Sequence, residues 1–278
     1  MSELKKAVII NSLSCYGKSS ITVALPILSA AEIETTVIPT ALFSTHTGIK
    51  DFVFTDVTSA ILPTAEHLNS LKIQFDAIGL GYLANKEQIL AASKAIDLLS
   101  KENTTVVIDP IMGENGKLYK RFTKTFPKYM LELCKKANVI TPNITEACLL
   151  ADVPFKAEYD EEYIADLAIK LYEKIGAKVV ITGISFDERK IGVAVYGGET
   201  VKYVFCDKVP TSYHGSGDIF SAGLLASLLN ERGLRAAAEI AQNFVCGCIK
   251  SSFENGAPEK SGIIFEKKLN NIRKYLEI

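Results

Sequence analysis

Short apolar segments rich in β-branched residues alternate with longer segments of helical periodicity along this chain. The pattern predicts strands over residues 7–10, 35–39, 77–80, 104–108, 138–141 and 178–182, and helices over 19–31, 86–100, 123–136 and 161–175. Segments such as TVVIDP and KVVITG are continuously apolar, which is typical of strands buried on both faces. The alternation therefore predicts an α/β fold, a three-layer αβα sandwich around a mostly parallel central sheet.

The pattern changes in the last third of the chain. Apolar runs at 191–196 and 202–209 flank Gly197, Gly198 and Glu199, which predicts an antiparallel hairpin at one edge of the sheet. Helices are predicted over 218–230, 234–253 and 264–276, and the apolar stripe of the last is expected to pack on the sheet. Neither a repeat nor a long linker divides the chain, so residues 1–278 are expected to form one domain.

Composition narrows the class of protein. Apolar residues make up 48% of the 278 residues, and 31 Lys and Arg nearly balance 32 Asp and Glu. No overall charge favours nucleic acid or an anionic membrane, and no apolar window reaches the roughly 18 residues of a membrane span. No signal-peptide pattern begins the chain, so a cytoplasmic location is expected. The six cysteines lie mostly in apolar segments and are expected to be buried thiols.

Polar residues follow the predicted strands at the ends where ligands of open parallel sheets bind. They are Asn11, Ser12, Gly81, Tyr82, Asp109, Thr141, Asn143, Glu146 and Thr182. Asp109 and Glu146 are candidates to hold Mg²⁺ together with retained waters. The alternatives are that Asp109 begins a turn and that Glu146 caps a helix. For Thr141 and Thr182 the alternative is a hydroxyl bonded to backbone at the strand end.

The stretch HGSGDIFSAG, residues 214–223, carries the most specific chemical signal. At a helix start the backbone N–H groups lack intrahelical partners, and Gly215, Ser216 and Gly217 leave them open to a phosphate. Asp218 would repel a bound anion, so a base that accepts a proton from a hydroxyl is the better interpretation. A simple helix cap is the alternative.

A second stretch has part of a phosphate-binding pattern. Gly17-Lys18-Ser19 resembles the end of a P-loop, but Ser12 stands where that loop needs its first glycine. Ser19 or Ser20 is therefore expected to be a helix N-cap, and Lys18 stays a candidate cation for a phosphate.

The sequence Gly215-Ser216-Gly217-Asp218 resembles the G-[ATS]-G-D anion hole of the ribokinase superfamily. The chain is similar to the pyridoxal kinase branch of that superfamily in INSLSCYGKSS (10–20), LFSTHTG (42–48), GLGYL (79–83), VIDPIMGENGKLY (107–119), VITPNITEACLL (139–150) and VVITG (179–183). The resemblance implies a ribokinase-like kinase that uses ATP and Mg²⁺ to phosphorylate the 5′-hydroxymethyl group of a B6 vitamer. It also implies a homodimer and a possible role for a monovalent cation.

The resemblance assigns roles to matching positions. Asp218 is the expected base, and the amides of Gly215, Ser216 and Gly217 are expected to face the γ-phosphoryl group of ATP. Ser12, His46, Thr47, Tyr82 and Tyr119 are expected around the vitamer, although a structural role for His46 is the alternative. Asp109, Thr141 and Glu146 match positions near the phosphates and metals, and Asn143 and Thr182 match nucleotide contacts. The chain departs from some members at Glu114 and in its shorter loop before Tyr119.

Three other functions remain open. A hydroxymethylpyrimidine kinase of thiamine synthesis shares this architecture and anion hole. A sugar or nucleoside kinase normally carries extra strands as a lid, and no insertion of that size is present. A non-catalytic metabolite-binding relative is expected to lack the aspartate or a glycine of the anion hole, and this chain retains both.

Overall fold

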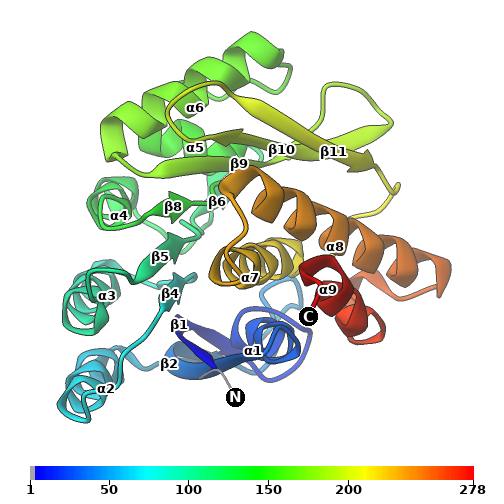
Figure 1. The fold of residues 1–278 in the computed structure, drawn as a ribbon. Coiled ribbons are helices and arrows are strands. Elements are labelled where there is room, and N and C mark those ends of the chain that lie inside the picture. The colour runs from blue at the N-terminus through cyan, green and yellow to red at the C-terminus, as the bar shows by residue number, and fades with distance from the viewer. Residues whose placement is uncertain (1–3) are drawn as a thin grey trace.

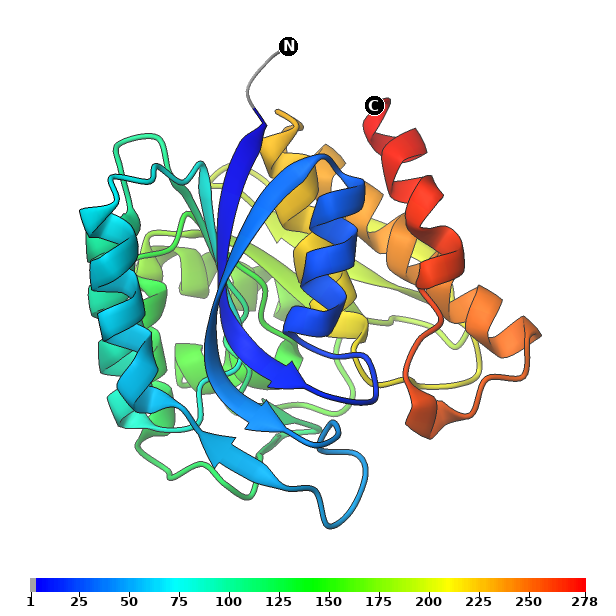
Figure 2. The same cartoon turned by 90° about the horizontal axis from the view of Figure 1, so that it is seen from below.

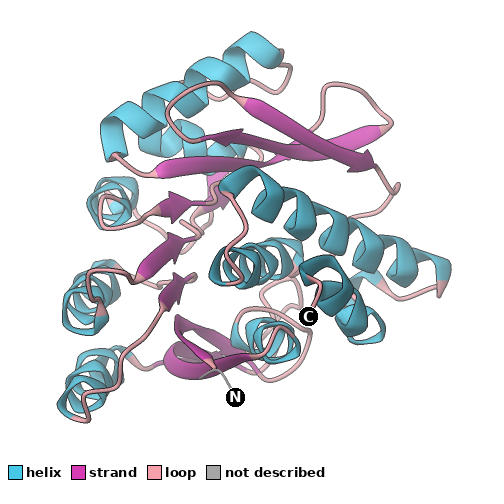
Figure 3. Cartoon of the chain, viewed as in Figure 1, coloured by secondary structure: helices cyan, strands magenta, loops and turns pink. Residues whose placement is uncertain are grey.

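The computed structural model describes residues 4–278 and contains a nine-stranded sheet with helices on both faces (Figures 1 and 3). The strands are β1 (Lys5–Ser14), β2 (Ile33–Phe43), β3 (Phe54–Asp56), β4 (Ala77–Leu80), β5 (Thr105–Ile108), β8 (Val139–Ile140), β9 (Lys178–Ile184), β10 (Lys190–Tyr196) and β11 (Lys202–Asp207). Their spatial order is β11-β10-β9-β8-β5-β4-β1-β2-β3. The strands from β9 to β2 in this order pair in parallel. The predicted mostly parallel sheet is confirmed.

Both edges of the sheet are antiparallel. β10 pairs with β9 and with β11, which confirms the predicted hairpin. At the opposite edge β3 pairs with β2. β3 has only three residues, too few to show a hydrophobic pattern in the sequence. A separate small hairpin joins β6 (Gly113–Glu114) to β7 (Lys117–Leu118).

Helices form a layer on each side of the sheet (Figures 1 and 2). One layer contains α2 (Thr58–Ser70), α3 (Lys86–Leu99), α4 (Phe126–Cys134), α5 (Ile144–Ala151) and α6 (Glu161–Ile175). The other contains α1 (Ile21–Ala30), α7 (Ser216–Leu229), α8 (Leu234–Glu254) and α9 (Leu269–Leu276). Within residues 4–278, no helix is both long enough and apolar enough to cross a membrane.

The apolar strands account for this layering. Successive side chains of a strand point to opposite faces, so Val8 and Ile10 of β1 enter one buried cluster while Ala7 and Ile9 enter the other. All four of these side chains are at most 4% exposed. A sheet with two such faces must be covered on both sides, which the two helical layers achieve.

The last helix differs from its prediction. α9 begins at Leu269, after a short 3₁₀ turn at Glu266–Lys268, and it packs on α1 and α8 (Figure 2). The predicted packing on the sheet is wrong because α7 and α8 already cover that face. Ile272 and Leu276 are buried between helices, whereas Tyr275 is exposed. The apolar side chains Val23, Ile27 and Leu28 of α1 are likewise buried in the core.

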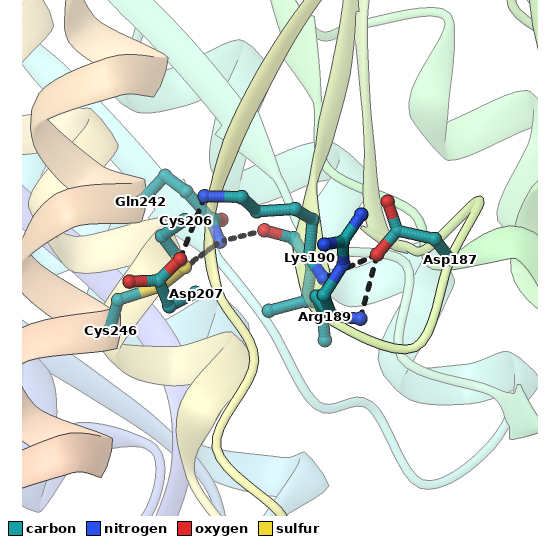
Figure 4. A network of polar contacts seen from close by, with 8 residues as sticks. Asp187, Arg189, Lys190, Cys206, Asp207, Gln242 and Cys246 are labelled. Atoms are coloured by element: carbon teal, nitrogen blue, oxygen red, sulfur yellow. Dashed lines mark hydrogen bonds and ion pairs between the residues drawn. A yellow bond between two sulfur atoms is a disulfide. The ribbon is translucent and has the colours of Figure 1, made fainter.

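The cysteines also correct an expectation. Cys206 of β11 and Cys246 of α8 form a disulfide, and Gln242 donates to both sulfurs at 3.3 Å (Figure 4). Cys15 is exposed, and only Cys134, Cys148 and Cys248 are the buried thiols expected from the sequence. A pairing between residues 40 positions apart depends on how α8 lies against β11, which local pattern does not reveal.

We predict that Cys206→Ser lowers the free energy of unfolding of the oxidised protein by about 2–4 kcal/mol, because the disulfide closes a 40-residue loop in the unfolded chain. Urea unfolding with and without a thiol reductant measures the effect. Cys15→Ser is the control and should leave the midpoint unchanged. Equal midpoints for Cys206→Ser and the parent under oxidising conditions would contradict the prediction.

Candidate active site

The carboxyl ends of β1, β4 and β5 lie side by side in the sheet, and the first turn of α7 lies above them. Between them is a small cavity of about 30 Å³, enough for a water molecule or two. Its polar lining includes Asn11, Ser20, Asp109, Asp218 and Ser221. The structure therefore brings Asn11, Gly81 and Asp109, three of the residues expected after strands, together with Asp218 of the GSGD stretch.

Gly215 is the N-cap of α7, and its φ of 88° lies in the left-handed region that favours glycine. A Cβ at this position would lie 2.4 Å from the carbonyl oxygen of Lys18, so a side chain cannot be accommodated. The N–H groups of Ser216 and Gly217 open the helix, where the macrodipole is positive. This geometry fits the binding of an anion.

Asp218 follows in the first turn of α7 and is half-buried. Burial raises the pKa of its carboxyl to about 6, although the nearby Ser20 N–H and Asn11 carboxamide lower the pKa in part. A carboxyl with a pKa in this range is suited to accept a proton near neutral pH.

Asp109 lies at the end of β5 and is 8% exposed. Its pKa is raised well above the ordinary value, first by burial and then by the charges of Glu146 and Asp218. Ser221 donates to Asp109 Oδ2 at 3.2 Å and lies 3.3 Å from Thr141 Oγ1. Sequence reasoning missed Ser221, although its position one helical turn after Asp218 places it on the same face of α7.

Glu146 lies on α5 and also caps that helix. Its side chain accepts from the backbone N–H of Asn143 at 2.9 Å and of Met112 at 3.0 Å, and Asn143 Oδ1 accepts from the Glu146 N–H, which completes a capping box. Burial raises the pKa of Glu146 to about 7 despite these donors. The helix-capping alternative is thus realised, while the carboxylate of Glu146 is also close enough to Asp109 to raise the pKa of that residue.

The remaining strand-end groups bond mainly within the protein. Asn143 Nδ2 donates to the carbonyl oxygen of Gly113 at 2.9 Å, and Thr182 Oγ1 lies 3.5 Å from the carbonyl oxygen of Pro142. Within residues 4–278, no three His, Cys, Asp or Glu side chains are arranged to hold a metal ion. Two buried carboxylates, Asp109 and Glu146, fit a cation that shares its ligands with a phosphate rather than one in an all-protein cage.

Phe43, Phe54, Tyr82 and Phe122 pack together as an aromatic wall. The Phe43 ring lies 5.1 Å from Phe54 and 5.4 Å from Tyr82, and Tyr82 lies 6.1 Å from Phe122. The Tyr82 hydroxyl is buried without a hydrogen-bond partner, and burial raises its pKa. Of the wall residues, only Tyr82 was predicted from the sequence as a site residue.

Tyr119 follows the β6–β7 hairpin and is 40% exposed, with its ring 6.4 Å from that of Phe122. Partial burial raises its pKa, and the charges of Glu146 and Glu114 add to the effect. Tyr119 therefore lies between the aromatic wall and the carboxylates, at a place from which its hairpin could cover a bound molecule.

Ser12 and His46 have partners within the protein. Ser12 is buried and donates from Oγ to Ser20 Oγ at 2.9 Å. His46 is buried, its Nδ1 accepts from the Gly48 N–H at 3.1 Å, and its Nε2 lies 2.9 Å from the carbonyl oxygen of Lys260. Both ring nitrogens are used, which supports the structural alternative for His46. Thr47, next to it, is exposed.

Lys18 and Ser20 differ in part from their expected roles. Lys18 Nζ lies 2.9 Å from Glu266 Oε2, an ion pair with the C-terminal segment rather than an open phosphate contact. Ser20 is the N-cap of α1, but its side chain makes no capping hydrogen bond. Sequence reasoning counted Asn11 among the polar residues that follow strands but gave it no role, and it expected Ser20 only as a helix cap. In the structure Asn11 lies within β1 rather than after it.

The sequence matches the family described as phosphomethylpyrimidine kinase over residues 25–262. The chain belongs to the phosphomethylpyrimidine kinase family. It is 33% identical to a pyridoxine kinase of Bacillus subtilis over 186 residues, 65% of this chain and 66% of that enzyme. The matched part thus spans just under two thirds of that relative.

Solved structures of this kinase family have the same fold. A Bacteroides thetaiotaomicron protein, in a crystal form with pyridoxal, is 35% identical with a TM-score of 0.92, covering 97% of this chain and 96% of its own. The Staphylococcus aureus pyridoxal kinase, solved with ADP, is 25% identical with a TM-score of 0.79, covering 90% of this chain and 89% of its own. The resemblance to the pyridoxal kinase branch and the expected fold class are confirmed.

The buried carboxyls of this kinase predict a pH dependence of stability. The pKa of Asp218 is raised from 3.8 to about 6 and that of Glu146 from 4.5 to about 7. The folded protein therefore keeps protons that the unfolded chain has lost, and the free energy of unfolding of the ligand-free protein should fall as pH rises from about 4 to 7.

Asp218→Asn should reduce this fall by about 3 kcal/mol, because the variant cannot ionise. Urea unfolding at several pH values, without nucleotide or divalent cation, measures it. Asp152→Asn, at the exposed C-cap of α5, should keep the parent's slope. An unchanged slope in Asp218→Asn would contradict the raised pKa.

Proposed function

We propose that this protein catalyses ATP-dependent phosphorylation of the 5′-hydroxymethyl group of a B6 vitamer, with residues 1–278 as one kinase domain. The observation that carries the proposal is the position of Asp218 beside the open amides at the start of α7, with a carboxyl pKa of about 6. The pyridoxine kinase relative, the neighbour with pyridoxal and the neighbour with ADP support the choice of substrates.

Phosphoryl transfer requires in-line positioning and neutralisation of charge more than covalent chemistry. Asp218 accepts the proton of the substrate hydroxyl. The hydroxyl oxygen attacks the γ-phosphorus of ATP, and ADP leaves. The N–H groups of Gly215, Ser216 and Gly217 donate to the oxygens of the transferring group, whose charge grows in the transition state.

Asp109 and Glu146, with Thr141 beside them, are the residues that would hold Mg²⁺. When bound, the ion neutralises charge on the phosphates of ATP. In the absence of the ion, the charges of Glu146 and Asp218, which raise the pKa of Asp109, would also repel the phosphates of the nucleotide. Asn143, the N-cap of α5, forms a parallel bridge with Thr182 of β9, and these two residues are the proposed nucleotide contacts.

The aromatic wall gives the substrate pocket its shape. A flat heteroaromatic ring can pack against Tyr82 and Phe122. Ser12 and Thr47 complete the proposed pocket, and the Tyr119 hairpin covers it. A homodimer, a monovalent cation and a cytoplasmic location belong to the proposal through the family resemblance alone.

We expect the highest kcat/KM with a B6 vitamer when ADP release is measured in parallel with pyridoxal, pyridoxine, pyridoxamine and the hydroxymethyl aminopyrimidine. A higher value for the pyrimidine would favour the alternative that the family description carries. ADP release at the background rate with all four would favour a non-catalytic relative.

Asp218→Asn should lower kcat by about two orders of magnitude or more, the scale of a general-base contribution, while ATP binding is retained. ADP release gives the rate, and calorimetric titration with ATP gives the affinity. Asp152→Asn is the matched control, since it removes an exposed carboxylate on α5. Near-parental turnover in Asp218→Asn would show that another group is the base.

A further inference from the structure

Ser20 has a backbone conformation that residues with side chains rarely adopt, with φ 57° and ψ −126°. These are the angles of the first central residue of a type II′ turn, a position dominated by glycine because a Cβ crowds the backbone there. Ser20 is 6% exposed and lines the same small cavity as Asp218. Strain of this kind persists only where the surroundings impose it, and it is concentrated at functional sites.

Two elements hold Ser20 in this conformation. On one side, Ser12 Oγ donates to Ser20 Oγ at 2.9 Å, and Ser20 forms an antiparallel bridge with Leu13 of β1. On the other, its carbonyl oxygen accepts from the N–H groups of Val23 at 3.1 Å and Ala24 at 3.0 Å, which begins α1. The strained residue is thus fixed between the first strand and the first helix.

The consequence is that the Ser20 N–H lies at the small cavity that Asp218 also lines and lowers the pKa of the Asp218 carboxyl, although the two residues are far apart in sequence. Any relaxation of Ser20 toward an ordinary conformation would rotate this N–H away from the carboxylate. Gly215, which precedes Asp218, packs its Cα against the carbonyl of Lys18 in the same loop. The β1–α1 loop and the start of α7 are therefore in close contact.

Asn11 also lines this cavity, and its carboxamide lowers the pKa of Asp218. Its Oδ1 accepts from the backbone N–H of Ser12 at 2.8 Å and of Tyr82 at 2.9 Å, so the orientation of its carboxamide is fixed. The Nδ2 group is left for Asp218. A Cβ at Gly81 would lie 2.3 Å from that nitrogen, so the glycine leaves the space that the carboxamide occupies.

We propose that Asn11 and Ser20 are positioning residues of Asp218: their two donors hold the carboxylate in one orientation toward the substrate hydroxyl, and the strain at Ser20 is retained for this purpose. This inference rests on the proposed function, in which Asp218 is the base. Neither residue contacts the reacting atoms, so their loss should affect kcat rather than the binding of either substrate.

The kinetic test uses Asn11→Asp, which keeps an acceptor for the Ser12 and Tyr82 amides but replaces the donor to Asp218 with a carboxylate oxygen. We expect kcat with ATP and pyridoxal to fall at least about tenfold while both KM values stay within about threefold. A merely structural role would change KM and kcat together or neither. An unchanged kcat would overturn the proposal.

Asn85→Asp is the matched control for this substitution. Asn85 Oδ1 also accepts a backbone N–H, from Gln88 at 2.8 Å, and its Nδ2 also donates to a carboxylate, Asp56 Oδ2 at 3.1 Å. It caps α3 on the other helical layer and does not contact Asp218. Its kcat and KM should remain those of the parent.

The strain is tested by thermal unfolding, independently of activity. Ser20→Gly and Ser20→Ala both lose the hydroxyl and differ only in the Cβ, so relief of strain should make the glycine variant melt a few degrees higher than the alanine variant. Ser19, with a negative φ in the same loop, is the control, and there the alanine variant should melt higher. The same order at both positions would overturn the claim of strain.

The outcome for Asp218→Asn separates the two proposals. If that variant keeps its turnover, the proposed base is wrong and the positioning role fails with it. If it is inactive while Asn11→Asp keeps the parent's kcat, the proposed function stands and only the positioning role fails.

Discussion

Three carboxylates, the buried Asp109 and Glu146 and the half-buried Asp218, lie at the carboxyl ends of the parallel strands, and the surrounding structure is arranged to keep them there. Burial of charge is costly unless donors or a cation compensate it. In this protein the donors are backbone N–H groups, the Asn11 carboxamide and the Ser221 hydroxyl. This compensation is incomplete, as the raised pKa values of all three carboxyls indicate. The site is electrostatically suited to a cation and to a proton that leaves an alcohol.

Glycines allow the loops above these strand ends to approach one another. A Cβ at Gly17 would lie 2.0 Å from the His46 ring, and one at Gly262 would lie 2.5 Å from the carbonyl oxygen of Gly17. His46, whose two nitrogens bond within the protein, thus stabilises the loop that carries Ser20. These loops are held together mainly by packing and by backbone contacts. His46 takes part in those contacts, although its polar neighbours in the sequence suggested a place in the substrate pocket.

The contacts of Glu146 and Lys18 show why the roles of these residues were difficult to predict from the sequence. Asn143 and Glu146 form a capping box, and yet Glu146 is also close enough to Asp109 to raise the pKa of that residue, so the capping and metal-binding interpretations do not exclude each other. Lys18 has the sequence context of a phosphate ligand but pairs with Glu266 near the C-terminus. Residues so far apart in sequence meet only because α9 packs beside α1.

The sequence by itself determined the layered fold, the antiparallel hairpin and the convergence of polar strand ends with the GSGD stretch, because hydrophobic periodicity and glycine placement are local properties. It also predicted α6 and β4 with their observed bounds. Only the tertiary structure decided the Cys206–Cys246 disulfide, the place of α9, the aromatic wall and the contacts of Asn11 and Ser20 with Asp218. Each of these depends on the relative placement of elements distant along the chain, and no periodicity within one segment records that placement.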